Sequence, residues 1–403
     1  MNQESIISLL KSLGLAPIAE QDISQLMISE KVIRCEAGDT LIAGMGSDKG
    51  KDDQIHLVVD AVHLCLQSNG EKKSIKLIFG RRNNSNEQAE VENAVALMIE
   101  SIKIPLKIET EVDGEKRGFK SESFDEDPKG KIKRWMQYLS RETKIPEFAK
   151  DLENAIHDDL FKWYRSVTGK YWSGRVGGLE VCTMDLAGQK GNLKVGNPGK
   201  NDDGPTRKVF LDILKKENFT DAEMTFSHPQ LDKVASIIRA IAESRRNAAL
   251  NEFQREHLLE SRVLSGKVEI VSKEGIMKPV FEDQPFQFPT LWAPSAKPRF
   301  VDALMRLGNI PYVVELKEPA GTKPGQGYRH AITQVVLYRE FVRRAKMLHP
   351  WFRKKGLVPD KCRAVVAFPE LSKGDKKQQM LLRQHEMVGN AFGVEIVEIK
   401  GFK

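Results

Sequence analysis

Two carboxylates and one ammonium group come close together in the sequence between residues 299 and 317. They belong to Asp302, Glu315 and Lys317. Two facing carboxylates repel one another unless a cation lies between them, and oxygen ligands of this kind suit Mg²⁺ or Mn²⁺. A lysine beside such a metal can orient an attacking water and stabilise negative charge on a phosphorane. These residue types therefore indicate a site for phosphodiester hydrolysis.

A predicted hairpin brings the three side chains to one face of a sheet. Gly308-Asn309 separates two strand-like runs and favours a two-residue turn, with glycine where a type II′ turn requires it. If the residues flanking this turn pair, Asp302 lies directly opposite Glu315 and both point to the same face. Lys317 points there too, because strand side chains alternate, and we expect a solvent cleft around them. The alternative is a solvated sheet face on which Glu315 and Lys317 form an ordinary ion pair.

The elements that must position this hairpin form the C-terminal part of the chain. Strand and helix patterns alternate there, which predicts an α/β region built on a mixed sheet. The predicted strands are 267–271, 299–307, 311–317, 363–368 and 394–399, and the predicted helices are 331–348 and 377–392.

The rest of the chain divides at a segment of linker composition. Residues 121–134 are rich in charge, with Pro and Gly and few apolar side chains. We predict an α+β domain of unknown role over 1–125, with strands at 54–67, 74–80 and 105–112 and a helix at 90–102. A second unit, regulatory or in contact with DNA, follows over 135–227, and the domain with the hairpin occupies 229–403.

Three motifs of this last domain resemble the PD-(D/E)XK, or restriction-endonuclease-like, nuclease superfamily. They are PRFVDALM, VVELK and QVVLY, in that order. The resemblance implies an αβββαβ core with Asp302, Glu315 and Lys317 as catalytic residues. It also implies Mg²⁺, with Mn²⁺ as a substitute, held by Asp302, Glu315 and the carbonyl of Leu316. One departure is Pro298, which three residues separate from Asp302.

Further members of the family's site follow from the same resemblance. Gln334 and Tyr338 match a Gln-x-x-x-Tyr motif, and their spacing of four places them on one helix face. Glu252, or else Glu256, matches a glutamate on the helix before the first strand. An ordinary structural role for Gln334 and Tyr338, packed on the sheet, is the alternative.

The total length near 400 and the run EFQREHLLESRVLSG are similar to the Shedu branch of the superfamily, which consists of bacterial antiphage nucleases. The resemblance implies a metal-dependent DNA endonuclease that acts in antiviral defence, with an N-terminal sensing or regulatory region. A homo-oligomer is expected for an enzyme that cuts both strands. The rival hypothesis is a non-catalytic nucleic-acid-binding protein that uses a nuclease-like scaffold. Either would be cytoplasmic, because no secretory signal is evident.

Charge is distributed unevenly along the chain, although the net formal charge is only +7. Residues 1–60 contain ten acidic and five basic side chains, whereas residues 322–357 contain nine basic and one acidic. The acidic segment could oppose the basic one electrostatically and restrain the nuclease. We predict a DNA phosphate-contact surface, rather than a merely solvated face, on the helix after Gln334. Its basic residues are Arg339, Arg343, Arg344 and Lys346.

Other classes of function receive no support. The run GMGSDKGKD lacks the spacing of a phosphate-binding loop, so no nucleotide cofactor is evident. The four cysteines show no Cys-x-x-Cys spacing, and no apolar run approaches the roughly 18 residues of a membrane-spanning helix. Aromatic and basic side chains interleave over 135–175, and an aromatic core is favoured there over a base-stacking surface.

Overall fold

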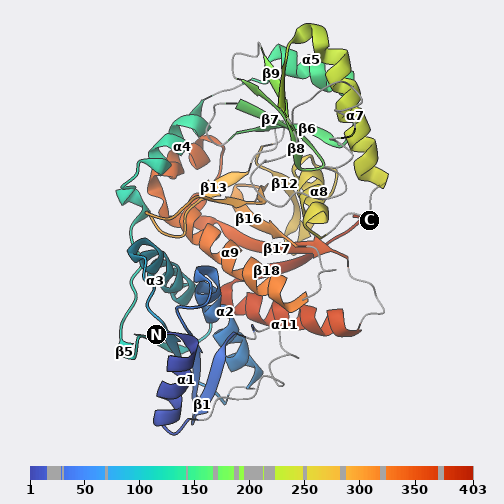
Figure 1. Cartoon of the computed structure of the whole chain (residues 1–403). Helices are drawn as coiled ribbons and strands as arrows, with labels where there is room; N and C mark the ends of the chain where they lie inside the picture. Colours follow the sequence, from blue (N-terminus) through green and yellow to red (C-terminus); the bar gives the residue numbers. More distant parts are fainter. Residues whose placement is uncertain are drawn as a thin grey trace.

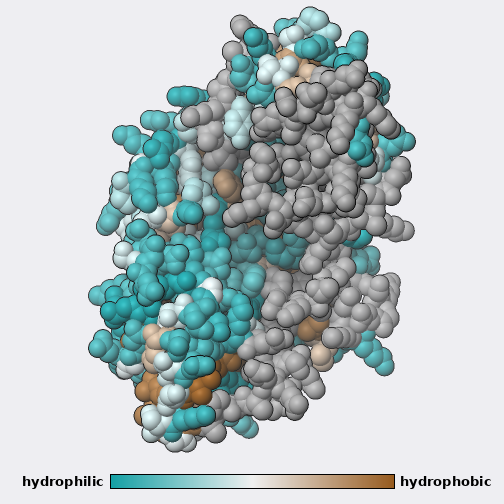
Figure 2. All heavy atoms as spheres, in the orientation of Figure 1, coloured by the Kyte–Doolittle hydropathy of each residue, from teal (hydrophilic) through white to brown (hydrophobic). Residues whose placement is uncertain are grey.

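The computed structural model is a mixed α/β protein with several sheets (Figure 1). It describes residues 1–15, 29, 31–68, 71–141, 144–166, 171–185, 190–194, 212, 223–247, 252–281, 287–317, 324–370 and 376–402. Within these ranges, none of the helices is both long and apolar enough to cross a lipid bilayer. The coloured part of the face in Figure 2 is mainly hydrophilic, and its largest hydrophobic patch lies at the lower left, where Figure 1 shows the first helix and strand.

The N-terminal unit is a five-stranded sheet in the order β1-β2-β3-β4-β5, in which β2, β3 and β4 are parallel. Helix α2 connects β2 to β3 and α3 connects β3 to β4, because parallel strands need a crossover connection between them. The elements are α1 (Gln3–Ser12), β1 (Ile33–Ala37), β2 (Thr40–Met45), α2 (Lys51–Gln67), β3 (Ser74–Phe79), α3 (Ser85–Glu100), β4 (Lys107–Val112), β5 (Glu115–Lys116) and α4 (Lys131–Ser140). The predicted strands 74–80 and 105–112 and helix 90–102 are confirmed.

The prediction of a strand over 54–67 is wrong, because this segment belongs to helix α2. Every side chain from Gln54 to Cys65 is buried, so the helix is covered on all sides. A helix buried all round has no solvent-exposed face, and its largely apolar run cannot be told from a buried strand by periodicity.

The middle unit is a five-stranded antiparallel sheet in the order β10-β9-β8-β7-β6. Its aromatic side chains form a core, as favoured from the sequence: Trp163 and Trp172 are buried with Phe161. The elements are α5 (Glu147–Ile156), β6 (Phe161–Arg165), β7 (Tyr171–Val176), β8 (Leu179–Asp185), β9 (Gly191–Lys194), β10 (Glu223–Phe226) and α7 (Leu231–Asn247).

The C-terminal unit is built on a six-stranded mixed sheet in the order β11-β12-β15-β16-β17-β18. Strands β12, β15 and β16 are antiparallel, and β16, β17 and β18 are parallel. The elements are α8 (Glu252–Leu264), β11 (Ile270–Ser272), β12 (Gly275–Pro279), β13 (Phe288–Thr290), β14 (Arg299–Val301), β15 (Ala303–Leu307), β16 (Ile310–Leu316), α9 (Pro324–Arg344), α10 (His349–Lys354), β17 (Arg363–Pro369), α11 (Lys376–Phe392) and β18 (Val394–Ile399). The predicted single strand 299–307 is interrupted at Asp302.

The N-terminal and C-terminal units share one hydrophobic core. Helix α2 packs against α9 and α11, and Leu57 and Val58 lie in the same cluster as Val335 and Leu337. The sequence alone predicts that a chain beginning near residue 229 folds by itself, because it retains the helices and strands of the predicted C-terminal domain. The shared core argues against that expectation, because truncation would expose the face of α9 that α2 covers.

The middle unit contacts the C-terminal unit at α8. Tyr164 of β6 is buried among Leu259 and Val263 of that helix. At the turn between β7 and β8, Gly178 has φ +88°, and a Cβ there would lie 2.7 Å from the backbone oxygen of His257. The turn therefore approaches α8 so closely that only glycine fits.

We predict that Gly178→Ala lowers the free energy of unfolding by about 2 kcal/mol or more, because it combines positive φ with overlap against backbone. Urea unfolding would measure this. Gly118→Ala is the matched control, since no atom of the described residues lies within 4 Å of its added Cβ, and it should change stability by less than about 0.5 kcal/mol. Equal stability of the two variants would show that the turn is not fixed against α8.

Candidate functional site

The hairpin of β15 and β16 has the predicted register. Pairing runs from Leu307 and Ile310 beside the turn to Ala303 and Val314 at the far end. Gly308 has φ +58°, as its turn position requires. The next step of this register sets Asp302 opposite Glu315.

Asp302 lies at a bend, where the chain leaves the hairpin and continues as β14. Strand β15 pairs with β16, whereas β14 pairs with β13, so residue 302 belongs to neither ladder. Its Oδ2 accepts a hydrogen bond of 2.8 Å from the backbone N–H of Leu316. The Asp302 side chain thus replaces the lost strand partner, and this bond holds the carboxylate beside the end of β16.

Glu315 is the most deeply buried acid of the site, with 2% of its surface exposed. Its Oε1 lies 3.0 Å from Nζ of Lys317, and among the described residues its buried Oε2 has no hydrogen-bond partner. The expectation that Glu315 faces an open solvent cleft is therefore wrong. It lies on β16, an inner strand flanked by β15 and β17, and helices α8 and α9 pack against this strand.

Burial and proximity shift the pKa values of all three groups. Burial raises the pKa of Asp302 well above its ordinary value, and the nearby Glu315 raises it further. Burial also raises the pKa of Glu315, although Lys317 opposes the shift. For Lys317, burial lowers the pKa, but Glu315 and Asp302 outweigh it and raise the pKa above its usual value. The ionised forms of both carboxylates are therefore disfavoured here, and Lys317 alone does not offset this cost.

Helix α8 brings further acids to the site. Glu256 Oε1 lies 3.8 Å from Nζ of Lys317. Glu256, the second candidate for the family's glutamate on this helix, is therefore next to the candidate catalytic lysine. The side chain of Glu252, the first choice, lies outside the described residues.

Sequence reasoning missed Glu260. It is buried, its Oε1 accepts a 2.7 Å hydrogen bond from Gln287, and its charge raises the pKa of both Asp302 and Glu315. The spacing of four from Glu256 could have found it, since residues so spaced share a helix face.

Helix α9 presents Gln334 and Tyr338 together, as the spacing of four predicted. Nε2 of Gln334 lies 3.4 Å from the hydroxyl of Tyr338. Burial raises the pKa of Tyr338 well above its ordinary value, and Glu315 and Asp302 raise it further. The Tyr338 hydroxyl therefore stays protonated at neutral pH and lies within electrostatic reach of the carboxylates.

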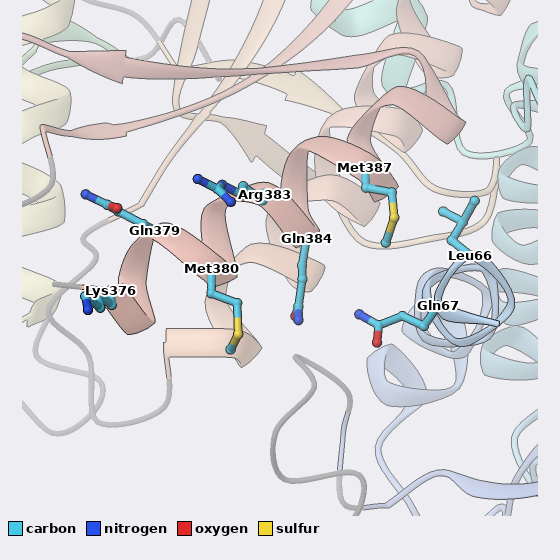
Figure 3. Close-up of a pocket in the computed structure, with 8 residues that line it drawn as sticks. All are labelled: Leu66, Gln67, Lys376, Gln379, Met380, Arg383, Gln384 and Met387. Atoms are coloured by element: carbon cyan, nitrogen blue, oxygen red, sulfur yellow. The ribbon is translucent and has the colours of Figure 1, made fainter. Parts of the chain in front are cut away.

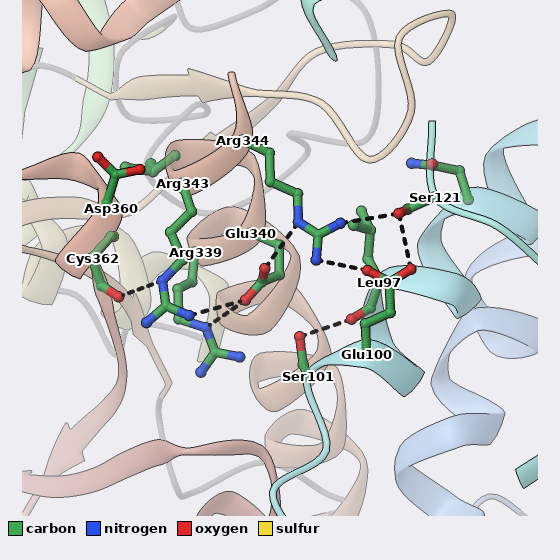
Figure 4. A network of polar contacts seen from close by, with 12 residues as sticks. Leu97, Glu100, Ser101, Ser121, Arg339, Glu340, Arg343, Arg344, Asp360 and Cys362 are labelled. Carbon is green, nitrogen blue, oxygen red and sulfur yellow. Dashed lines mark hydrogen bonds and ion pairs between the residues drawn. The ribbon is translucent and has the colours of Figure 1, made fainter. Parts of the chain in front are cut away.

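The predicted phosphate-contact surface on α9 is largely occupied by internal contacts (Figure 4). Arg339 is 1% exposed and donates to the carbonyls of Phe392 and Gly393, so its prediction as a DNA contact is wrong. A buried guanidinium must satisfy its N–H groups inside the protein. Glu340 lies beside it and accepts from the basic side chains around it.

The three other basic residues also have partners within the protein. Arg343 donates to the carbonyl of Cys362, and Arg344 pairs with Glu340 at 3.2 Å and Glu100 at 2.7 Å. Lys346 pairs with Asp360 at 2.7 Å. These contacts neutralise the end of α9 and argue against it as the main contact with DNA phosphates.

The residues present fit a small, hard divalent cation. In the described part of the chain, no three His, Cys, Asp or Glu side chains form a closed metal cage. Mg²⁺ does not require one, since it keeps several waters and is bound through one or two carboxylates. Asp302, Glu315 and the carbonyl of Leu316 supply such a set, and within the described ranges Oε2 of Glu315 has no other hydrogen-bond partner.

A pocket of about 470 Å³ lies elsewhere, between α11 and the end of α2 (Figure 3). Met380, Gln384 and Met387 project from α11 toward Leu66 and Gln67. The buried carboxylates are not among the residues that line it, so we place the functional site at the hairpin on chemical grounds.

In comparisons with known proteins, the sequence matches no family model, and no similar curated protein was found. The function must therefore be argued from the site itself.

We predict that Lys317→Met lowers the free energy of unfolding at pH 7 by about 3 kcal/mol, because it leaves Glu315 buried without its partner. Urea unfolding would measure this. Lys116→Met is the control: Lys116 pairs with Glu109 at 3.2 Å but is 72% exposed, so its loss should cost less than about 1 kcal/mol. An equal cost for both variants would mean that the buried pair is not what stabilises the site.

Proposed function

We propose that this protein is a metal-dependent nuclease that hydrolyses phosphodiester bonds in DNA. The observation that carries the proposal is the convergence of Asp302, Glu315 and Lys317 at the end of one hairpin, with both carboxylates held at raised pKa. A protein rarely holds a half-buried acid beside a buried one, both at raised pKa, unless they have a ligand or a catalytic task. The order α8, antiparallel strands, α9 and parallel β17 is compatible with a restriction-endonuclease-like core.

Asp302, Glu315 and the Leu316 carbonyl would hold Mg²⁺, with Mn²⁺ as a substitute. Bound there, the ion would supply Lewis-acid polarisation of the phosphate and of a water. Lys317 stays charged, because its pKa is raised, and so serves to orient the water and stabilise the phosphorane rather than to accept a proton. Glu256 lies close enough to Lys317 to hold the ammonium in place.

The choice of DNA and a role in bacterial antiphage defence rest on the resemblance to Shedu-like nucleases, and assembly into a homo-oligomer rests on the need to cut both strands. They belong to the same proposal. The N-terminal unit would then serve for sensing or regulation.

A non-catalytic nucleic-acid-binding protein is the second candidate, and one contact favours it. Lys317 already lies 3.0 Å from Glu315, so it neutralises one of the two carboxylates without any metal. A purely structural ion pair would look the same at that contact. It would not explain Asp302, whose additional charge makes the buried group more costly.

We predict that Asp302→Asn reduces Mg²⁺-dependent cleavage of supercoiled plasmid by on the order of 100-fold or more. The variant should be at least as stable as the wild type, because an amide can still accept from Leu316 and no longer repels Glu315. Gel assays with Mg²⁺ and with EDTA, together with thermal unfolding, would measure both effects.

Asp360→Asn is the control, since this carboxylate is 52% exposed and pairs with Lys346 away from the site. It should cut like the wild type. Plasmid binding without cleavage by the wild type, in either Mg²⁺ or Mn²⁺, would favour the non-catalytic candidate. Full activity of Asp302→Asn would reject the site.

A further inference from the structure

A second buried polar cluster lies where α2 of the N-terminal unit crosses α9. Arg329 is 2% exposed, and its guanidinium lies 3.3 Å from Asp60 and 3.3 Å from Asp53. The rings of His56 and His330 stack beside this pair, with centroids 4.0 Å apart and planes 16° apart. We call these five residues the polar seam. The acidic segment 1–60 thus forms direct ion pairs with the basic segment 322–357, as the opposite charges of the two segments suggested.

The polar seam lies next to the candidate site along α9. His330, Gln334 and Tyr338 are spaced by four, so they follow one face of the helix from the seam to the carboxylates. The charge of Lys317 acts on His330 and that of Arg299 acts on both His56 and Tyr338, so the two clusters are within electrostatic reach of each other. Movement of the seam would therefore move Gln334 and Tyr338.

Arg299 forms a second link between the units at the same place. It lies on β14, three residues before Asp302, and its guanidinium is 2.6 Å from Asp52 and 3.6 Å from Glu90. The same guanidinium lies 3.5 Å from the ring centre of Trp292. Acidic residues of the N-terminal unit therefore hold both α9 and the strand that leads into Asp302.

The seam is a costly way to join two units. Among the described residues, Arg329 Nε, His56 Nδ1 and His330 Nε2 are buried without hydrogen-bond partners. Burying two charges costs several kcal/mol per ion, on the order of what their attraction returns, and apolar side chains of similar size would serve stability as well. Burial raises the pKa of Asp60 to about 6, because the ionised carboxylate is costly to bury.

We propose that Asp60 and His56 are positioning residues, through which the N-terminal unit fixes α9 so that Gln334 and Tyr338 face the carboxylates and Lys317. This inference rests on the proposed nuclease function. The N-terminal unit is then part of the working site, and a partner or ligand that displaced α2 would alter cleavage by moving α9. An ion pair has one defined geometry, whereas apolar packing permits small shifts.

The test compares Asp60→Asn with Glu100→Gln in the full chain. Glu100 also joins the N-terminal unit to α9, through its 2.7 Å pair with Arg344, but it does so at the end of α9 distant in sequence from Gln334. Amide hydrogen exchange over residues 329–338 and plasmid cleavage in Mg²⁺ are measured below the unfolding temperature of every variant. Asp60→Asn should exchange at least 10-fold faster there and cut at least 10-fold more slowly. Glu100→Gln should match the wild type in both.

A rescue variant separates positioning from general damage. Asp60→Asn with Arg329→Gln removes both charges, so stability should recover. Exchange over 329–338 should stay faster than in the wild type and cleavage at least 5-fold below it, because α9 lacks its fixed link. If Asp60→Asn does not fold, Asp53→Asn replaces it, since Asp53 pairs with the same guanidinium from a more exposed position.

Three results would overturn the proposal. One is unchanged exchange over 329–338 in a folded seam variant, and another is faster exchange with cleavage within twofold of wild type. The third is an equal effect of Glu100→Gln. A wild type that exchanges normally but never cuts plasmid rejects the nuclease function itself, and the positioning role with it, whatever the seam variants do to exchange.

Discussion

The repulsion between two carboxylates in a dry environment is the constraint on which this structure depends. Asp302 and Glu315 meet because one turn fixes the register of one hairpin. Glu315 is held within the sheet, and Asp302 is held beside it by the bond from the Leu316 N–H. Three features compensate: the Leu316 N–H that bonds to Asp302, the Lys317 ammonium beside Glu315, and a place for a divalent cation. The first two do not compensate fully, since burial and nearby acids still raise the pKa of both carboxyl groups.

The surrounding elements increase this imbalance. Helix α8 adds Glu256 and Glu260, and α9 covers the site with Tyr338, whose hydroxyl stays neutral. The middle unit fixes α8 through the tight turn at Gly178, and the N-terminal unit contacts α9 through Arg329. All three units of the chain thus contribute contacts to one site. A nuclease domain that folds by itself, with a regulator that can detach, would not need these contacts.

Local rules predicted the parts of the fold that local interactions decide. The turn at Gly308 set the hairpin register, and alternation then placed Glu315 and Lys317 together. The strand predicted over 54–67 was wrong because α2 is buried on all sides, which depends on α9 and α11 far along the chain. The sequence predicts a surface cation at Arg339, because it shows the charge of a side chain but not how deeply that side chain is buried. Glu260 was overlooked because its importance appears only when α8 lies over the hairpin.

The binding of Mn²⁺ tests the central claim most directly, because it needs no substrate and no assumption about DNA. Isothermal titration calorimetry at pH 7 should detect one Mn²⁺ per chain in the wild type. Asp302→Asn should weaken that binding at least 10-fold, whereas Asp360→Asn should leave it unchanged. A wild type without measurable binding, or equal affinity in Asp302→Asn, would contradict the claim that the buried carboxylates are arranged to hold a cation.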